Sequence, residues 1–340
     1  MLSSTEQIAF ILLVVVCGGL AFQGFRRIYV IVSQGKPSYR TDDFPFRLIK
    51  ALIDVGLQKP VFKARPIVSI FHAFIFFGFS FYLLVNVNDL LEAFVEGWTT
   101  IGSSNPVALG FNLFSDLFSI FVLVGIIYFL IRRFIGKPKV FEFNSNVKLQ
   151  SEVESGGIRK DSLIVGVFII FHVGARWLGT AFHLAERETT EWSMPTASLV
   201  APFFFGWENV ETGIHVTWWL AMGLIVLFLP YFPRSKHIHI FLAPLNLAFT
   251  NREEKGKLME PTDSSSPGAS SLDELPWKQV FDSYACIMCT RCHEVCPAHH
   301  SGTPLSPSAL EINKRYFINQ NAAGLANGST KLDLLNDAIS

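Results

Sequence analysis

Five long apolar stretches constrain the fold of this chain more than any other feature. About twenty apolar residues cross the hydrocarbon core of a bilayer as one helix. Half of the 340 residues are hydrophobic and only 16% are charged, so a water-soluble fold would expose too much apolar surface. The sequence therefore predicts an all-α membrane protein with five transmembrane helices, at about residues 7–32, 66–93, 110–135, 162–185 and 213–232.

Basic residues lie at one set of ends of these stretches. They gather in segment 26–65, after the third stretch at Arg132 and Arg133, and after the fifth at Arg234 and Lys236, whereas the opposite loops are rich in glutamate. The positive-inside rule then predicts that the N-terminus is outside and the C-terminal part is cytoplasmic. The first stretch lacks a basic start and a small-residue cleavage site, so we interpret it as an uncleaved anchor.

A cysteine motif near the C-terminus predicts the chemistry. Its spacing, C-x₂-C-x₂-C-x₃-C-P, is typical of bacterial [4Fe–4S] sites. Zinc sites usually show two separated cysteine pairs, and disulfides are rare in a reducing compartment. The motif therefore predicts electron transfer through an iron–sulfur cluster, and its ligands are Cys286, Cys289, Cys292 and Cys296. The formal net charge is zero, so no nucleic-acid partner is expected.

A change of composition divides the chain near residue 250. Residues 251–275 are polar and rich in serine, proline and glycine, which is typical of a surface linker. We expect a transmembrane domain at 1–250 and a small, cytoplasmic, ferredoxin-like domain at 276–340. A short helix that begins near Leu275 should lead to Cys286.

Histidines in the apolar stretches are candidate haem ligands, because a histidine in hydrocarbon is costly and haem b iron binds two imidazoles. His172 and His183 are eleven residues apart, so they lie on one side of a helix together with Arg176 and Gly179. Arg176 could then contact haem propionates, and Gly179 would leave room for the macrocycle. Helix–helix hydrogen bonding is the alternative for each histidine. The candidate ligands are His72, His172, His183, His215 and His239.

The other polar residues in these regions have less specific interpretations. His237 is expected at the membrane interface, and the histidines around the cysteine motif are expected to face solvent. Tyr82 and Asp116 could contact a quinone or hydrogen-bond a neighbouring helix. Lys278 and Arg291 could belong to a docking face or to an ordinary solvated surface.

The exit of the fifth stretch resembles the last helix of the gamma subunit of respiratory nitrate reductase. Pro233, His239 and Pro244 repeat a proline–histidine–proline spacing of that family. The resemblance implies that His239 and His72 bind an inner haem b. At the two outer-haem ligand positions this chain has Tyr82 and Ala221. Either the protein binds one haem, or His183 and His215 bind a second one. We favour the second haem, because these two histidines lie at matching depth.

The cytoplasmic part resembles the iron–sulfur subunit of heterodisulfide reductase, through residues 277–286, the cysteine motif and residues 302–307. Both modules in this order are similar to membrane-bound electron-transfer-flavoprotein:menaquinone oxidoreductases. That resemblance implies a bacterial or archaeal inner-membrane protein, embedded in lipid, that transfers electrons between electron-transfer flavoprotein and menaquinone.

The same family has a second cysteine motif downstream. We therefore expect that the iron–sulfur domain is incomplete at its C-terminus, or that an additional iron–sulfur subunit completes a second cluster. Otherwise the four cysteines all bind one cluster.

Two other functions remain open from the sequence. One is a heterodisulfide- or thiol-coupled quinone oxidoreductase subunit, which shares both modules. The other is a haem-free membrane anchor for an iron–sulfur partner. An optical spectrum of b-type haem distinguishes the anchor from the electron-transfer protein.

Overall fold

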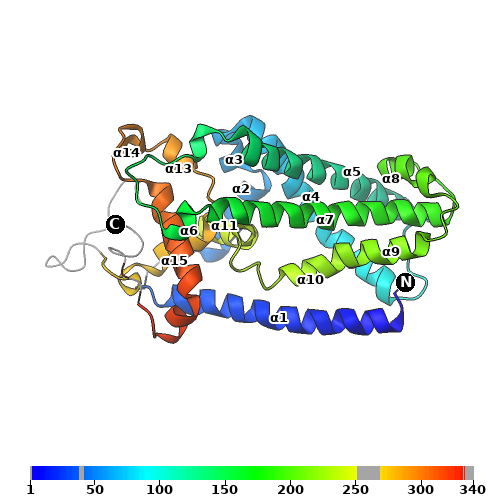
Figure 1. Cartoon of the computed structure of the whole chain (residues 1–340), viewed down its shortest axis with the longest axis horizontal. Helices are drawn as coiled ribbons and strands as arrows, with labels where there is room; N and C mark the ends of the chain where they lie inside the picture. Colours follow the sequence, from blue (N-terminus) through cyan, green and yellow to red (C-terminus); the bar gives the residue numbers. More distant parts are fainter. Residues whose placement is uncertain (1, 38–41, 251–268, 332, 334–340) are drawn as a thin grey trace. The chain divides into compact units, whose positions relative to one another are not determined.

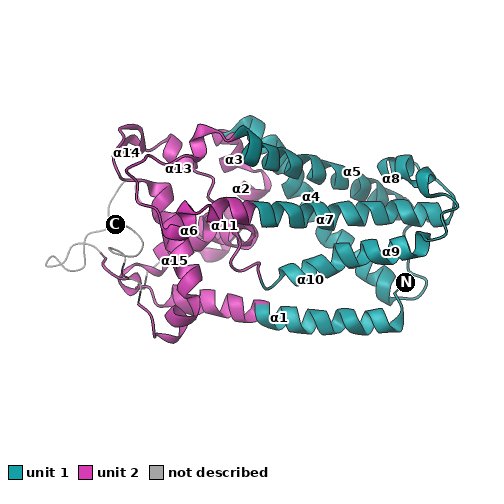
Figure 2. Ribbon diagram, viewed as in Figure 1, with its two compact units in different colours: residues 1–20, 65–136, 163–230 teal, residues 21–64, 137–162, 231–340 magenta. Residues whose placement is uncertain are grey.

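The computed structural model describes residues 2–37, 42–250, 269–331 and 333. Within these residues every regular element is a helix, and pairing of the β type is limited to two isolated bridges (Figure 1). The chain divides into two compact units (Figure 2). Unit 1 comprises residues 1–20, 65–136 and 163–230, and unit 2 comprises residues 21–64, 137–162 and 231–340.

Five helical segments are long and apolar enough to cross a membrane, which confirms the prediction of five such helices. Four of them begin and end within four residues of the predicted bounds, and the segment Gly157–Glu186 begins five residues before its predicted start. The fifth contains a π-helical turn, η4 (Trp219–Gly223), between α9 (Val210–Trp218) and α10 (Leu224–Phe228). The other four are α1 (Ser4–Ser33), α4 (Pro66–Phe94), α5 (Pro106–Ile131) with the π-turn η1 (Arg132–Gly136), and α7 (Gly157–Glu186).

Proline and small residues explain how the helices of unit 1 begin and pack. Pro66 and Pro106 occupy the first positions of α4 and α5, where a missing N–H costs nothing. Gly125 on α5 lies against α4, because a Cβ there would come within 2.9 Å of the Phe71 carbonyl oxygen. Small residues of this kind allow close helix approach in membranes. The core between α4, α5 and α7 includes Val85, Val122, Ile126, Val165, Ile169 and Val173.

Short helices cover the end of unit 1 that contains the loop after α7. They are α8 (Pro195–Val200) and η3 (Ala201–Phe204), and α8 packs against α5. Ala197 and Ala201 are fully buried in a small cluster with Leu184 of α7. This packing fixes the loop that covers the polar part of the unit.

Unit 2 is built from shorter helices around α15 (Pro307–Asn327). Its main core joins Ile31, Ile238, Val280 and Ile318, which are each fully buried. The remaining helices are α2 (Phe44–Gly56), α3 (Lys59–Ala64), η2 (Lys139–Phe141), α6 (Ser151–Glu154), η5 (Lys236–Ile238), α11 (His239–Ala248), η6 (Leu272–Glu274), α12 (Trp277–Ala285), α13 (Arg291–Glu294) and α14 (Pro297–His300).

Helix α12 confirms the short helix that was predicted to lead to Cys286. Segments 21–64 and 137–162 group with the C-terminal residues in unit 2, so the units do not follow a single cut along the chain. Residues 251–268 of the predicted linker lie outside the described residues. The domain boundary near residue 250 stays a prediction.

Candidate functional site

The four motif cysteines lie on one short, sharply turning segment of unit 2. Cys286 follows the last residue of α12 with an extended backbone. Met288 and Thr290 have positive φ angles of 56° and 60°, a left-handed conformation that residues other than glycine seldom adopt. Cys292 lies on α13, and Cys296 immediately precedes α14. The segment therefore folds back on itself between successive cysteines.

The motif sulfur atoms have a few polar neighbours. All four cysteines are free thiols. The Met288 N–H donates to Cys286 Sγ at 3.4 Å, and Cys289 is close enough to interact electrostatically with both Cys286 and Cys292. Hydrogen bonds to sulfur are typical of iron–sulfur sites. Across the described ranges, no three His, Cys, Asp or Glu side chains are grouped tightly enough to bind a metal ion.

A buried arginine lies beside the first cysteine. Arg315 on α15 is 0% exposed, and its NH1 group donates to the carbonyl oxygens of Tyr284 at 2.9 Å and Cys286 at 2.8 Å. Its NH2 group donates to the carbonyl oxygens of Ser235 at 2.5 Å and Arg234 at 3.4 Å. No ion pair of the described residues includes Arg315, and its Nε has no hydrogen-bond partner.

A buried cation is costly, and burial lowers the pKa of Arg315. The nearby Cys286 sulfur and Asp161 carboxylate oppose that effect, so negative charge around Arg315 favours its charged form. Burial raises the pKa of the Cys286 thiol to about 12, whereas a metal ligand must be a thiolate. The positive charge of Arg315 favours that thiolate. A cluster held by four thiolates carries net negative charge and would balance the arginine. The donor set and this counter-charge therefore fit an iron–sulfur cluster.

The expectation that all the histidines around the motif face solvent is wrong for His293. Its side chain is 1% exposed, and its Nε2 lies 2.6 Å from the Ser306 hydroxyl. The ring stacks on His299 at 4.1 Å and meets the edge of Phe143 at 5.3 Å. The single turn of α13 directs His293 inward, while Cys292 on the same turn is exposed. His300 is exposed, as expected.

His239, the predicted inner-haem ligand of unit 2, is the first residue of α11. Its Nδ1 lies 2.8 Å from the Lys236 carbonyl oxygen, an arrangement that leaves Nε2 for a metal. Burial lowers the pKa of His239 to about 4, so the imidazole is neutral at pH 7, as an iron ligand must be. His237 is buried, not exposed at an interface, and its ring meets Phe232.

The predicted partner of His239 is His72, which lies on α4 in unit 1. The two histidines therefore belong to different units. Their pairing on one haem stays a prediction.

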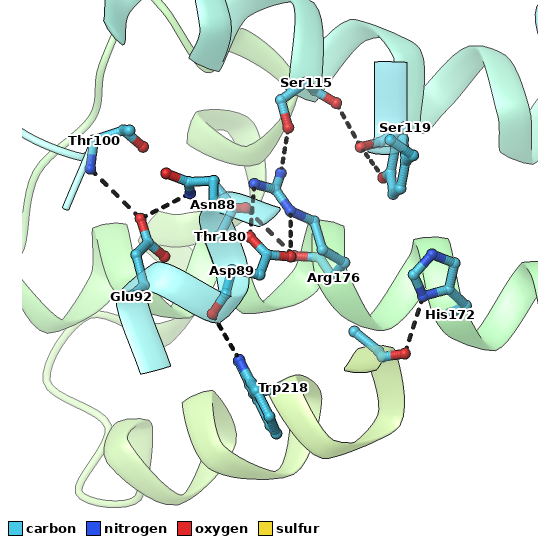
Figure 3. A network of polar contacts seen from close by, with 12 residues as sticks. Asn88, Asp89, Glu92, Thr100, Ser115, Ser119, His172, Arg176, Thr180 and Trp218 are labelled. Atoms are coloured by element: carbon cyan, nitrogen blue, oxygen red, sulfur yellow. Dashed lines mark hydrogen bonds and ion pairs between the residues drawn. The ribbon is translucent and has the colours of Figure 1, made fainter. Parts of the chain in front are cut away.

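His172 makes a helix–helix contact inside unit 1. It is 1% exposed, and its Nδ1 lies 3.0 Å from the carbonyl oxygen of Ala221 in the π-turn η4 (Figure 3). Its ring lies 5.6 Å from that of Tyr82 and 5.8 Å from that of Phe168. The expected resemblance to the nitrate reductase gamma subunit aligns Tyr82 and Ala221 with its outer-haem ligand positions. In this chain the His172 ring contacts both of those positions.

Arg176, a predicted haem contact, forms an ion pair with Asp89 of α4. Its Nε lies 3.4 Å from Asp89 Oδ2, and its NH1 donates to the Ser115 hydroxyl at 2.6 Å (Figure 3). Both side chains of the pair are nearly buried. They line a polar cavity of about 50 Å³ together with Glu92 and His183, which has room for a few water molecules.

The two histidines proposed for a second haem have different surroundings. His183 lines the cavity, with its Nδ1 3.9 Å from a Glu186 carboxylate oxygen. His215 is outside the cavity lining, and its Nδ1 lies 2.9 Å from Glu6 Oε1. Gly179 serves helix packing, because a Cβ there would come within 2.8 Å of the α9 residue Thr217. A second haem on His183 and His215 stays a prediction.

Asp116, considered as a quinone contact, caps a helix. Its carboxylate accepts hydrogen bonds from the Thr196 N–H at 2.7 Å, the Thr196 hydroxyl at 2.8 Å and the Ala197 N–H at 3.0 Å. These donors belong to the first turn of α8. Tyr82 likewise bonds a neighbouring helix, through the Ser119 hydroxyl at 2.6 Å. Helix–helix hydrogen bonding therefore accounts for both residues.

We expect Asp116→Ala to lower the free energy of unfolding by about 1–3 kcal/mol, because buried N–H groups would lose their acceptor. Chemical denaturation in detergent micelles measures this change. Glu96→Ala is the control, because Glu96 is an exposed carboxylate, and surface changes of this kind stay within about 0.5 kcal/mol. Equal stability of the two variants would contradict the capping role.

Comparison with known proteins identified three similar bacterial proteins. The chain is 28% identical over 305 residues to the probable iron-sulfur-binding oxidoreductase FadF of Bacillus subtilis (strain 168), covering 88% of the chain and 41% of that protein. It is 23% identical over 319 residues to the EtfAB:quinone oxidoreductase of Syntrophomonas wolfei subsp. wolfei, covering 90% and 42%. It is 33% identical over 86 residues to the probable membrane-anchored ferredoxin of Chromohalobacter salexigens, covering 21% and 13%.

These names support an iron–sulfur oxidoreductase associated with a membrane. The expectation of an oxidoreductase agrees with the names of the two relatives that cover most of the chain. The chain spans about two fifths of the length of each of them. No family model and no solved structure matches the chain. The nitrate reductase-like cytochrome b fold and the ferredoxin-like domain stay predictions.

Proposed function

We propose that this chain transfers electrons between a cytoplasmic donor and the menaquinone pool. Electron-transfer flavoprotein is the proposed donor. The name of the Syntrophomonas relative, EtfAB:quinone oxidoreductase, supports both this flavoprotein and a quinone as redox partners. Menaquinone and haem b enter the proposal through the family resemblance. The five apolar helices support the membrane location. The orientation, with the N-terminus outside and the cysteine motif cytoplasmic, is proposed from the positions of the basic residues.

One observation carries this proposal: a fully buried arginine donates to the backbone carbonyl of the first cysteine of a four-cysteine motif. Cys286, Cys289, Cys292 and Cys296 would hold a [4Fe–4S] cluster, and Arg315 would balance its charge. His72 and His239 would hold haem b. One-electron transfer is the chemistry that these groups supply when bound. The chain's own residues position the groups, orient His239 through the Lys236 carbonyl and exclude water from Arg315.

The optical spectrum of the purified protein tests the proposal. We expect a b-type haem band in the reduced-minus-oxidised difference spectrum, and we expect His72→Ala and His239→Ala each to remove the inner haem. His237→Ala is the matched control, because His237 is buried two residues from His239 and has no assigned haem role. Haem content that is unchanged in both ligand variants would contradict the assignment.

A haem-free membrane anchor is the second candidate function. The name of the Chromohalobacter relative, probable membrane-anchored ferredoxin, favours it. An iron–sulfur signal without any b-type haem band would support the anchor over the electron-transfer chain.

A further inference from the structure

Helix α2 of unit 2 has an apolar face that the described residues leave exposed. Phe46 is 63% exposed, Ile49 58% and Ile53 53%. Leu52 extends this side of the helix at 52% exposure, and Leu57, the residue after its end, is 59% exposed. A contiguous apolar face of this kind is unfavourable in water and marks an interaction surface.

The opposite face of α2 is packed against α11. Arg47 is 5% exposed and its NH1 donates to the carbonyl oxygen of Ala248 at 3.2 Å, and Ala51 is 4% exposed. The rings of Phe44 and Phe249 stack at 5.2 Å. The side of α2 that carries Arg47 is therefore buried against protein. Its apolar side is the exposed one.

Helix α11 in turn packs against α12, which ends at the cysteine loop. The Asn246 side chain donates to Asp282 at 2.6 Å, and the rings of Phe249 and Trp277 lie 4.9 Å apart. Lys278, considered for a docking face, is buried and pairs with Asp282 at 2.5 Å. Helices α2, α11 and α12 thus form one packed series that ends at Cys286.

Chain order and charge indicate what covers the exposed face. Helix α2 lies in the sequence between α1 and α4, and both are able to cross a membrane, so segment 34–65 returns to the membrane face from which it leaves. Residues 42–65 contain five basic and three acidic residues. Lys50 and Lys63 are exposed. Apolar surface next to exposed lysines fits a bilayer surface with anionic head groups.

We propose that α2 lies in the bilayer surface, with its apolar face among the acyl chains and the neighbouring lysines at anionic head groups. It anchors to that surface the unit that carries the cysteine loop. The proposal rests on the membrane location given under the proposed function.

Photo-crosslinking of the full chain in vesicles of phosphatidylethanolamine and phosphatidylglycerol tests the proposal. A photoreactive amino acid at Ile53 should yield lipid adducts that mass spectrometry detects. Asp54 lies on the flank of α2 and pairs with Lys59 at 3.2 Å. The same photoreactive amino acid at position 54 should give far fewer lipid adducts. Leu83, 70% exposed on α4, is the control for membrane insertion itself.

Each outcome separates this proposal from the one on which it rests. Lipid adducts at Leu83 and Ile53 but not at Asp54 support a surface-lying α2. Adducts at Leu83 without any at Ile53 overturn the role of α2 and leave the membrane location intact. Crosslinks from Ile53 to protein in place of lipid would show that polypeptide covers the face, which also overturns it. No lipid adduct at either Leu83 or Ile53 would contradict the membrane location.

Discussion

The Cys286→Ser variant is expected to lose the iron–sulfur cluster. A serine hydroxyl remains protonated at neutral pH and is a poor substitute for the soft thiolate ligand that these clusters require. Cys286 is also the cysteine with the most specific surroundings, since its sulfur accepts the Met288 N–H and its carbonyl accepts Arg315. Iron and acid-labile sulfide analysis, with the paramagnetic resonance signal of the reduced cluster, measures the loss.

Cys17→Ala provides the control for this experiment. Cys17 is buried in α1 against Phe10, Met222 and Val226, and it is the only cysteine outside the motif. We expect this variant to keep its iron and sulfide. If Cys286→Ser retained a cluster of unchanged content and signal, the ligand assignment from the motif would be wrong.

The membrane helices were predictable from sequence because their signal is local. Length and apolarity of a stretch decide whether a helix can cross a bilayer, and neither depends on the rest of the fold. The prolines that begin α4 and α5 act locally as well. The π-turn η4 was not predicted, since its residues Trp219–Gly223 have the composition of an ordinary apolar helix.

The polar contacts inside the membrane unit were harder to predict, because they depend on which helix faces which. An arginine in an apolar stretch requires a partner, and haem propionates were the partner predicted from the sequence. Asp89, itself an acidic residue in an apolar stretch, was the available signal for the ion pair with Arg176. The same limit applies to Gly179, whose neighbour Thr217 lies on another helix.

The cysteine motif predicted the ligands but not the residues that support them. His293 is buried because one turn of α13 directs it toward Ser306 and Phe143, and spacing alone does not indicate that direction. Arg315 gave no sequence signal either. It lies in a polar helix beside another basic residue, and its partners are backbone carbonyls 29 to 81 residues away.

Replacing Arg315 by methionine should lower the reduction potential of the cluster and destabilise unit 2. Reduction adds negative charge to the cluster, and a nearby buried cation stabilises that charge. Removing the Arg315 cation therefore favours the oxidised form of the cluster. We expect a decrease of at least about 59 mV, a tenfold change in the ratio of oxidised to reduced cluster for a one-electron couple. We also expect the free energy of unfolding to fall by about 3–5 kcal/mol, because the partner charge is left unpaired and buried.

A redox titration followed by paramagnetic resonance measures the potential, and chemical denaturation in micelles measures stability. Arg315→Lys keeps the charge but cannot bond all four carbonyls, so it should recover most of the potential and little of the stability. Asn319→Ala is the matched control on α15, because the half-buried Asn319 donates to the Arg234 carbonyl at 3.1 Å through a solvent-exposed hydrogen bond. It should alter neither property, within about 0.5 kcal/mol for stability. Equal potentials in the Arg315→Met and unmodified proteins, with full cluster content, would refute Arg315 as the counter-charge.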